Sequence, residues 1–356
     1  MKIYIITGEQ SGDLHAANLV SAIKKKNNQV EIRAWGGNHL KSEGVQLVKH
    51  IKHTSFMGVW EVMRNIFKIY NNIHLCKKDI LSFKPDKLVL VDYPGFNLKI
   101  AKFAKEHNIH VTYYIPPKVW AWNQRRVNQI KKYIDETLVI FPFEVDFYKR
   151  FGIIANYVGN PLCTYISSKN LNYQETNTIA FLPGSREQEI RNILPKMLSI
   201  IPHFKGYRFK LAATTNVSKE LYKEISDHID IEICYDDTYN ILSQSRAALV
   251  TSGTATLETA LLGVPQIVCY KTSWITYLLA KIFVRVRSIS LVNILLEKEV
   301  VNELIQKELN TENLVQSLTN LLDDSSLILE HYKALKVLLG NQDASSNAAK
   351  MILTID

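Results

Sequence analysis

The sequence has few cysteines, and they are scattered. The four are Cys76, Cys163, Cys234 and Cys269, with no Cys-x-x-Cys pair and no histidine pair at metal-ligand spacing. This pattern argues against a disulfide framework and against a zinc site of common spacing. It favours free thiols in a reducing compartment.

The sequence also lacks a long apolar run. No stretch reaches the roughly 18 uninterrupted apolar residues that a membrane-spanning helix needs. The N-terminus, residues 1–9, is too short in its apolar part for a signal peptide, and it predicts the first strand of a domain instead. We therefore expect a cytoplasmic protein, either free or attached to a membrane surface from the cytosol.

Acidic residues are fewer than basic ones. There are 34 Asp and Glu against 43 Lys and Arg, which gives a net charge of +9. A surplus of this kind favours anionic partners such as nucleic acid, acidic lipid headgroups or phosphorylated substrates, without choosing among them. The 47% of hydrophobic residues is ordinary for a globular protein, and 356 residues suggest two domains.

Short apolar runs alternate with amphipathic segments, and no fixed-period repeat is present. The predicted strands cover 3–7, 31–35, 87–91, 111–115 and 136–140 in the first half, and 178–182, 209–213, 231–234, 247–250 and 266–270 in the second. Strand, loop and helix in repetition predict parallel sheets with helices on both faces. The expected fold class is α/β, with two doubly wound, Rossmann-like domains that face across a cleft. We expect the first domain to cover 1–165 plus a C-terminal helix at about 341–356, and the second to cover 166–340.

Two loops of the first domain place carboxylates at predicted strand ends. The loop 8–13 stands between a strand and a helix, where backbone N–H groups attract anions, and Glu9 in that place suits hydroxyl groups better than phosphate. Asp92 closes another strand and is well placed as a general base. Structural alternatives stay open: Glu9 or Asp13 caps the helix, and Asp92 bonds its own backbone in a turn.

Two loops of the second domain suit a diphosphate. A buried strand ends in Ser252, Gly253 and Thr254, and a helix begins at once, so its free N–H groups can bind phosphate. Glu258 lies one turn into that helix, where a carboxylate can accept hydrogen bonds from two ribose hydroxyls. Arg186 ends the stretch Leu-Pro-Gly-Ser-Arg, and a guanidinium suits bidentate phosphate contact. For Arg186 the alternative is a solvated side chain at a helix start.

Two segments have wide apolar faces with basic flanks, residues 57–83 and 274–287. Basic-flanked helices that bear aromatic residues can lie in a bilayer interface. An ordinary buried helix is the alternative for each segment. The side chains that we expect to contact a membrane are Val59, Trp60, Met63 and Phe67.

In their order along the chain, these stretches resemble the lipid-A-disaccharide synthase family, which are inverting glycosyltransferases of the GT-B fold. The matching residues are 8–13, 57–62, 92–97, 119–122, 125–126, 141–144, 182–186, 252–258 and 290–295. They span nearly the whole chain. The Val-Trp-Ala-Trp stretch at 119–122 and the Pro-Phe-Glu stretch at 142–144 are not generic to nucleotide-sugar transferases, so the resemblance is specific.

The resemblance implies two acylated substrates. The donor would be UDP-2,3-diacylglucosamine and the acceptor 2,3-diacylglucosamine 1-phosphate (lipid X), joined as a β-1′,6-linked disaccharide in the lipopolysaccharide pathway of a Gram-negative-type bacterium. The first domain would face the acceptor and the membrane, and the second would bind the donor. The protein would be peripheral to the cytoplasmic face of the anionic inner membrane, with no nucleic-acid partner. The sequence leaves open whether it forms a homodimer.

The resemblance also assigns residues. It implies Asp92 as the general base and Glu9 as the neighbouring catalytic carboxylate. The donor-binding positions would be Arg186, Ser252, Gly253, Thr254, Glu258 and Asn293. The acceptor-binding positions would be Gly8, Ser11 and Asn97.

Some features depart from the commonest family pattern. Gly95 stands where a second Asp is frequent, Val292 replaces a frequent Pro, and Pro117-Lys118 replaces a Ser-containing pair. No Asp-x-Asp motif of metal-dependent transferases stands at a strand end, so we expect no obligatory metal and no cofactor. Three alternatives stay open: a GT-B transferase on a polyprenyl-linked acceptor, a UDP-sugar epimerase, and a non-enzymatic lipid-binding protein.

Overall fold

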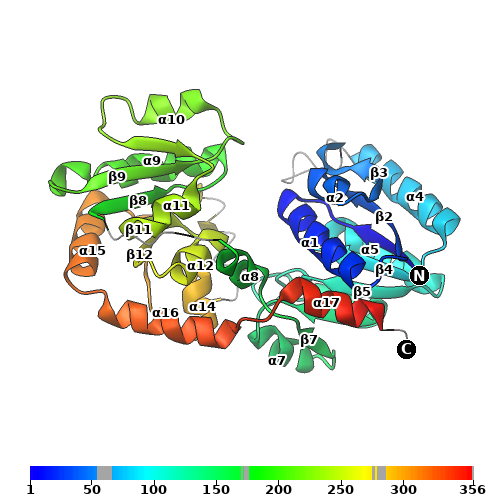
Figure 1. The fold of residues 1–356 in the computed structure, drawn as a ribbon. Coiled ribbons are helices and arrows are strands. Elements are labelled where there is room, and N and C mark those ends of the chain that lie inside the picture. Colours follow the sequence, from blue (N-terminus) through cyan, green and yellow to red (C-terminus); the bar gives the residue numbers. More distant parts are fainter. Residues whose placement is uncertain (54–65, 170, 172–175, 275–276, 279–285, 355–356) are drawn as a thin grey trace. The chain divides into compact units, whose positions relative to one another are not determined.

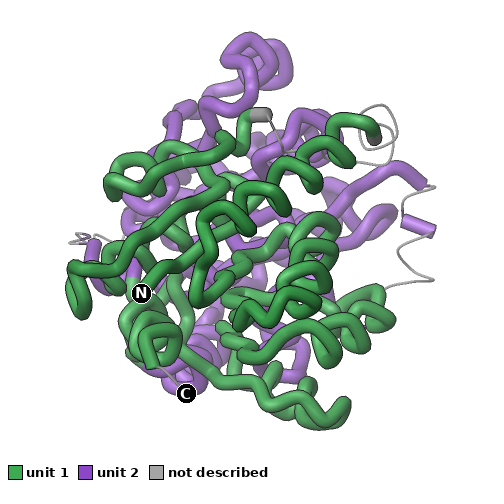
Figure 2. The backbone as a smooth tube through the Cα atoms, turned by 90° about the vertical axis from the view of Figure 1, so that its right-hand side faces the viewer, with its two compact units in different colours: residues 1–164, 341–356 green, residues 165–340 purple. Residues whose placement is uncertain are grey.

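The computed structural model describes residues 1–356 except 54–65, 170, 172–175, 275–276, 279–285 and 355–356. The chain divides into two compact units, which Figure 2 shows in two colours. Unit 1 is Met1–Thr164 with Asn341–Asp356, and unit 2 is Tyr165–Gly340. Each unit contains one parallel sheet with interleaved helices, so the expected α/β class with two doubly wound domains is confirmed.

The sheet of unit 1 has seven parallel strands in the order β3-β2-β1-β4-β5-β6-β7 (Figure 1). The chain builds outward in one direction from β1 and in the other from β4, so the switch point of the sheet lies between these two strands. The strands are β1 (Lys2–Ile6), β2 (Glu31–Gly36), β3 (Gln46–His50), β4 (Lys87–Val91), β5 (His110–Tyr114), β6 (Glu136–Val139) and β7 (Ala155–Tyr157).

Helices cover both faces of this sheet because its inner strands are apolar on both sides. Along β1, Ile3 and Ile5 belong to one buried cluster, while Tyr4 and Ile6 belong to the other. The helices are α1 (Gln10–Lys26), α2 (Asn38–Ser42), α4 (Ile66–Phe83), α5 (Pro94–Glu106), α6 (Arg126–Tyr133), α7 (Phe143–Lys149), α8 (Pro161–Ser167, which crosses into unit 2) and α17 (Ala344–Leu353), with a 3-10 turn at Ile51–His53.

Unit 2 repeats the plan with six parallel strands in the order β10-β9-β8-β11-β12-β13, and its switch point lies between β8 and β11. The strands are β8 (Thr178–Leu182), β9 (Arg208–Ala213), β10 (Glu232–Tyr235), β11 (Ser245–Thr251), β12 (Gln266–Tyr270) and β13 (Asn302–Ile305). The helices are α9 (Glu187–Leu198), α10 (Lys219–Ile225), α11 (Thr238–Ser243), α12 (Thr254–Leu261), α14 (Leu291–Leu296), α15 (Thr311–Asp323) and α16 (Ser326–Leu339), with a 3-10 turn at Ile201–His203.

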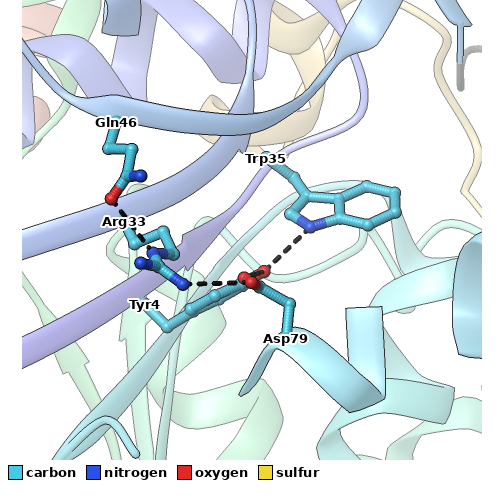
Figure 3. Close-up of polar contacts among 5 residues, drawn as sticks. All are labelled: Tyr4, Arg33, Trp35, Gln46 and Asp79. Carbon is cyan, nitrogen blue, oxygen red and sulfur yellow. Dashed lines mark hydrogen bonds and ion pairs between the residues drawn. The ribbon is translucent and has the colours of Figure 1, made fainter. Parts of the chain in front are cut away.

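A polar network holds α4 against the sheet of unit 1 (Figure 3). Asp79 of α4 accepts a hydrogen bond from the Tyr4 hydroxyl at 2.7 Å and pairs with Arg33 at 3.0 Å. The Trp35 indole donates to the same Tyr4 hydroxyl at 2.9 Å, and Arg33 also donates to Gln46 at 3.2 Å. The network ties one helix to three neighbouring strands and therefore fixes which face of α4 turns outward.

The expected membrane segment is only partly visible. Val59, Trp60 and Met63 lie outside the described residues. Phe67 lies on α4 and is 82% exposed. Among the helices of the described ranges, none combines the length and the apolar character that crossing a bilayer requires.

Candidate functional site

A cavity of about 530 Å³ opens at the carboxyl ends of β8 and β11, at the switch point of unit 2. Open α/β sheets bind ligands at this position, because strand-end loops and helix N-termini converge there. Four strand ends and the loops after them line it, those of β8, β9, β10 and β11. Five of the predicted donor-binding residues line the cavity: Arg186, Ser252, Gly253, Thr254 and Glu258.

The loop between β11 and α12 has a backbone that favours glycine. Gly253 has φ +149°, where side chains are rarely tolerated. The Thr256 hydroxyl donates to the Gly253 carbonyl at 2.8 Å, and the Ser252 hydroxyl donates to Ile289 at 2.9 Å, so the loop is fixed from both sides. Thr254 is the first residue of α12 and lines the cavity. The backbone N–H groups of this first helical turn have no partner inside the helix. This end of α12 suits an anion.

Arg186 stands at the rim of the cavity. It is the residue that precedes α9, and its side chain is 70% exposed. Glu189 lies 3.5 Å from the guanidinium and also accepts a hydrogen bond from the Ser185 N–H at 3.3 Å. Gly184 has φ +109°, and a Cβ there would lie 2.5 Å from the Glu189 carboxylate, so a glycine lets the loop close on that carboxylate. The guanidinium is thus held above the cavity with most of its surface accessible.

Glu258 is half-buried where α12 borders the cavity. The Tyr239 hydroxyl of α11 donates to Oε1 at 3.0 Å. Burial raises the pKa of the Glu258 carboxyl, and the bond from Tyr239 opposes that shift. Sequence reasoning missed Tyr239, because it comes from another helix and has no local motif. It aims the carboxylate, whose other oxygen can accept hydrogen bonds from hydroxyl groups.

The structure gives Asn293 a different role from the predicted donor contact. Its side chain is 2% exposed on α14. Its amide oxygen accepts from the N–H groups of Val300 and Val301 at 2.8 and 2.9 Å, and its amide nitrogen donates to the Val301 carbonyl and to Glu303. These bonds use the hydrogen-bonding capacity of the amide, so Asn293 ties the loop before β13 to α14. The donor contact of Asn293 stays a prediction, which these internal bonds do not support.

In unit 1 the loops after β1 and β4 approach one another at the switch point. A Cβ on Gly8 would lie 2.2 Å from the Tyr93 ring, so only glycine allows that ring to pack over the loop. Across the described residues 9–26, the Glu9 side chain makes no capping bond to α1. Burial raises the pKa of the Tyr93 phenol to about 12, and the negative charge of Glu9 adds to that shift. Glu9 therefore lies within electrostatic reach of the residue next to Asp92.

The remaining residues of this loop divide into structural and exposed positions. Asp13 is buried and accepts hydrogen bonds from the N–H groups of Gly37 at 2.6 Å and His39 at 2.9 Å, so it caps α2 rather than α1. Ser11 is exposed on the first turn of α1. This exposure is compatible with the predicted acceptor contact of Ser11.

Asp92 has an unusual backbone. It has φ +46° and the following Tyr93 has φ +50°, so two consecutive residues other than glycine adopt the left-handed conformation. The Asp92 carbonyl accepts hydrogen bonds from Asn97 at 2.6 Å and from the Tyr113 hydroxyl at 2.8 Å. Burial raises the pKa of the Asp92 carboxyl, while the positive charge of Lys118 and the N–H of Tyr93 oppose that shift. A partly desolvated carboxylate with a raised pKa is suited to take up a proton.

The Asn97 side chain holds the backbone of the Asp92 turn. Its side chain is fully buried, and its amide nitrogen also lies 3.3 Å from the Val91 carbonyl. In this structure the amide nitrogen of Asn97 positions the backbone of the Asp92 turn, and the contact of this side chain with an acceptor stays a prediction.

Glu144 is a buried carboxyl that sequence reasoning did not assign. It accepts hydrogen bonds from the Trp120 indole at 3.0 Å and from the Phe141 N–H at 3.1 Å. Burial raises the pKa of Glu144 to about 7, and these two bonds and the charge of Lys118 oppose that shift. The bond between Trp120 and Glu144 joins the Val-Trp-Ala-Trp stretch to the Pro-Phe-Glu stretch. These two motifs were the only features of the sequence that could have pointed to Glu144.

Two departures from the family pattern can be placed. Gly95 is exposed in the first turn of α5, and no heavy atom lies within 4 Å of the position of a Cβ there. Val292 is fully buried in α14, whose first turn is capped by the Ser290 hydroxyl.

In the part of the chain that the structure describes, no three His, Cys, Asp or Glu side chains gather as a metal site would require.

Solved structures of other proteins share the fold of this chain. MnaA of S. aureus, in a co-structure with UDP, has a TM-score of 0.70 at 16% identity and covers 99% of this chain and 95% of that one. The glycotransferase of kitacinnamycin has a TM-score of 0.69 at 11% identity, over 99% and 98%. At these identities the likeness shows the fold alone. Two doubly wound units of this kind define an α/β protein of the GT-B class.

The sequence comparisons identify a single family within this fold. The model of the lipid-A-disaccharide synthetase family matches residues 3–355. The lipid-A-disaccharide synthase of Syntrophus aciditrophicus (strain SB) is 36% identical, over 99% of this chain and 97% of the relative. The chain belongs to the lipid-A-disaccharide synthetase family.

Proposed function

We propose that this protein is a glycosyltransferase that moves 2,3-diacylglucosamine from UDP-2,3-diacylglucosamine to the 6-hydroxyl of 2,3-diacylglucosamine 1-phosphate. The products are a β-1′,6-linked disaccharide 1-phosphate and UDP. The observation that carries the proposal is the family match over residues 3–355, which covers both units and all the site residues. This match favours lipid A chemistry over an epimerase or a transferase for polyprenyl-linked acceptors.

Unit 2 binds the donor in this proposal. The diphosphate lies at the N-terminal end of α12, near Thr254, and Arg186 binds it from the rim. Glu258, aimed by Tyr239, accepts hydrogen bonds from the ribose hydroxyls. These groups are electrostatically suited to stabilise the charge that develops on UDP as it leaves.

Unit 1 binds the acceptor and supplies the base. Asp92 takes the proton from the acceptor 6-hydroxyl while that oxygen attacks the anomeric carbon of the donor. The bond from that carbon to the diphosphate oxygen breaks in the same step, and its electron pair leaves with UDP, so the configuration inverts. Glu9, beside Tyr93, assists by accepting hydrogen bonds from acceptor hydroxyls.

Unit 1 also contacts the membrane in this proposal, at the cytoplasmic face of the inner membrane. The outward face of α4 exposes Phe67 by 82% and Tyr70 by 71%, with Lys68 and Lys78 exposed beside them. Aromatic side chains flanked by lysines suit an interface with anionic lipids. Co-sedimentation with phosphatidylglycerol vesicles tests this. Phe67→Ser with Tyr70→Ser should lower the bound fraction several-fold, and His74→Ser, an exposed polar position on the same helix, should leave it unchanged.

Release of UDP from purified protein tests the reaction. We expect release with the acylated UDP-sugar and lipid X together, and little release when either is replaced by its unacylated counterpart. UDP-sugar consumed without any acceptor would favour an epimerase. Transfer to a polyprenyl-linked acceptor but not to lipid X would contradict the proposed acceptor.

A further inference from the structure

The segment that follows β5 is strongly basic. Residues 107–134 contain no Asp or Glu, and their lysines and arginines are Lys118, Arg125, Arg126, Lys131 and Lys132. Three of these cations precede or begin α6 and therefore lie toward the carboxyl edge of the sheet, where Asp92 stands. Lys131 lies at the other end of α6, with its ammonium 3.2 Å from the Cβ position of Gly152.

Two of these cations are close to the proposed base. The ammonium of Lys118 is near enough to both Asp92 and Glu144 to oppose the rise that burial causes in their pKa values. Arg126 lies over the Trp122 ring, 5.2 Å from its centroid. Its charge also acts on the Tyr113 phenol, whose hydroxyl donates to the Asp92 carbonyl. The loop itself meets the Asp92 turn, because the Asp92 N–H donates to the Ile115 carbonyl at 3.2 Å. Lys118 and Arg126 therefore approach this turn from the same loop.

In the part of the chain that the structure describes, none of these three cations forms an ion pair with a carboxylate within 4 Å. Lys118 and Arg125 are exposed, and Arg126 is half-buried. Within the described part of unit 1, ion pairs within 4 Å involve Lys2, Arg33, Lys102 and Lys105 and none of these three residues. Three cations near the carboxylates of Asp92 and Glu144 leave a positive surplus, which suits an anion.

The chemistry of the acceptor indicates which anion fits. In a hexopyranose 1-phosphate, the carbon that bears the phosphate and the carbon that bears the CH₂OH group are both bonded to the ring oxygen. A phosphate bound beside Asp92 therefore places the 6-hydroxyl close to the base. An ammonium and a guanidinium are suited to a phosphate monoester dianion, since the guanidinium can bind two of its oxygens.

We propose that Lys118 and Arg126 bind the 1-phosphate of the acceptor and thereby orient its 6-hydroxyl toward Asp92. The inference rests on the proposed function and extends it, because it names the group of the acceptor that is recognised and the residues that recognise it. An anionic phospholipid headgroup offers the same phosphate chemistry, and the experiment separates the two sources.

The test compares lipid X with 2,3-diacylglucosamine that lacks the 1-phosphate, both in the same detergent micelles. Lys118→Gln and Arg126→Gln should each raise the KM for lipid X roughly tenfold to a hundredfold, which is the range expected for the loss of one charge-assisted bond. The KM for the acceptor without phosphate and the KM for the donor should change less than about twofold. Lys118→Arg should restore most of the lipid X affinity. Lys131→Gln, which removes the same charge at the far end of α6, should behave as the wild type.

Three results would overturn the inference. One is an equal loss on both acceptors, which would indicate a structural role. Another is a rise confined to the donor KM, which would place the cations at the diphosphate. The third is reduced co-sedimentation of Lys118→Gln with phosphatidylglycerol vesicles while the preference for lipid X persists, since that would assign the cations to headgroups.

Failure of the proposed function would look different. A wild type that transfers no sugar to either acceptor would contradict the transferase itself. Calorimetry with water-soluble glucosamine 1-phosphate would still test whether Lys118 binds the phosphate. We expect binding to the wild type, and at least tenfold weaker binding to Lys118→Gln. No binding to the wild type, or equal binding to the two proteins, would overturn the inference. Matching melting curves would show that the variants are folded.

Discussion

At the scale of single residues, the backbone of Asp92 and Tyr93 costs free energy that the surroundings must offset. Left-handed conformations of residues other than glycine cost of order 1–3 kcal/mol each. The bonds from Asn97 and Tyr113 to the Asp92 carbonyl hold this turn in place. Strain that neighbours enforce at the mouth of a parallel sheet supports the proposal that Asp92 does chemistry.

Replacing the base tests this role. Asp92→Asn keeps the size and polarity of the side chain but cannot take up the proton, so we expect kcat to fall by about 10²–10⁴. The dissociation constant for UDP should stay unchanged, because the donor cavity is lined entirely by unit 2. Steady-state turnover with lipid X and calorimetry with UDP measure the two quantities. Wild-type turnover in this variant would refute the assignment.

The pH dependence of the reaction should report the same carboxyl. Asp92 must be ionised to act, and burial raises its pKa above the ordinary value of 3.8, so kcat/KM should fall as the pH drops through this raised value. Lys118 opposes the rise, so Lys118→Gln should move the acid limb to higher pH. Profiles of kcat/KM for the two proteins measure this. A limb that does not move in the variant would show that Asp92 is not the titrating group.

Much of the site follows from residue type and position. Strand-end carboxylates and the small residues at 252–254 are visible in sequence, because the carboxyl ends of parallel strands gather ligand-binding loops. The roles of Asn97 and Asn293 were not visible. A buried amide that holds backbone and an amide that holds a ligand look alike in sequence, and only the contacts distinguish them.

At the scale of elements, the inner strands were predictable, and of the four edge strands only β10 was. β1, β4 and β8 are continuous apolar runs because both of their faces are buried. The missed strands are β3, β7 and β13, which are edge strands with partly exposed positions. The fourth edge strand, β10, is also partly exposed, and it was predicted at 231–234. Such short, half-exposed segments lose the apolar signal, so pattern alone does not separate them from loops.

The network around Asp79 should stabilise unit 1 through α4. Asp79→Ala leaves the Tyr4 hydroxyl and the Arg33 guanidinium without their partner, so we expect a loss of about 2 kcal/mol in the free energy of unfolding. Tyr4→Phe keeps the ion pair but removes both the bond to Asp79 and the acceptor of the buried Trp35 indole, so it should cost about as much. Glu106→Ala, which breaks an exposed pair with Lys102, should cost less than about 0.5 kcal/mol. Urea unfolding followed by tryptophan fluorescence measures all three, and a loss in Glu106→Ala equal to the other two would contradict the ranking.

At the scale of the whole molecule, the end of the chain belongs to unit 1. Residues 341–356 follow unit 2 in sequence, yet Ala348, Ala349 and Ile352 of α17 belong to the core that contains β1 and α1. The terminal segment is therefore part of the first folding unit, while the donor cavity is built from unit 2 alone.

This division predicts separable effects. Ile352→Ala should destabilise unit 1 by roughly 2–5 kcal/mol, because Ile352 is fully buried. The affinity for UDP at low temperature should not change, since no residue of α17 lines the donor cavity. Lys350→Ala, an exposed neighbour on α17, is the matched control for stability. A loss of UDP affinity in Ile352→Ala would contradict the separation.

The fold alone does not select the reaction. A UDP-N-acetylglucosamine 2-epimerase of Neisseria meningitidis and the glycotransferase of kitacinnamycin both share it, at 14% and 11% identity. The choice of the transferase over the epimerase comes from the family match over residues 3–355. What the protein does with an acceptor therefore distinguishes the two reactions.

The most direct measurement is mass spectrometry of the product that purified protein forms from UDP-2,3-diacylglucosamine and lipid X. The account predicts one new lipid, a tetraacylated disaccharide carrying a single phosphate, formed in equal amount to the UDP released. Recovery of both lipids unchanged, or of an isomerised UDP-sugar without a disaccharide, would contradict it.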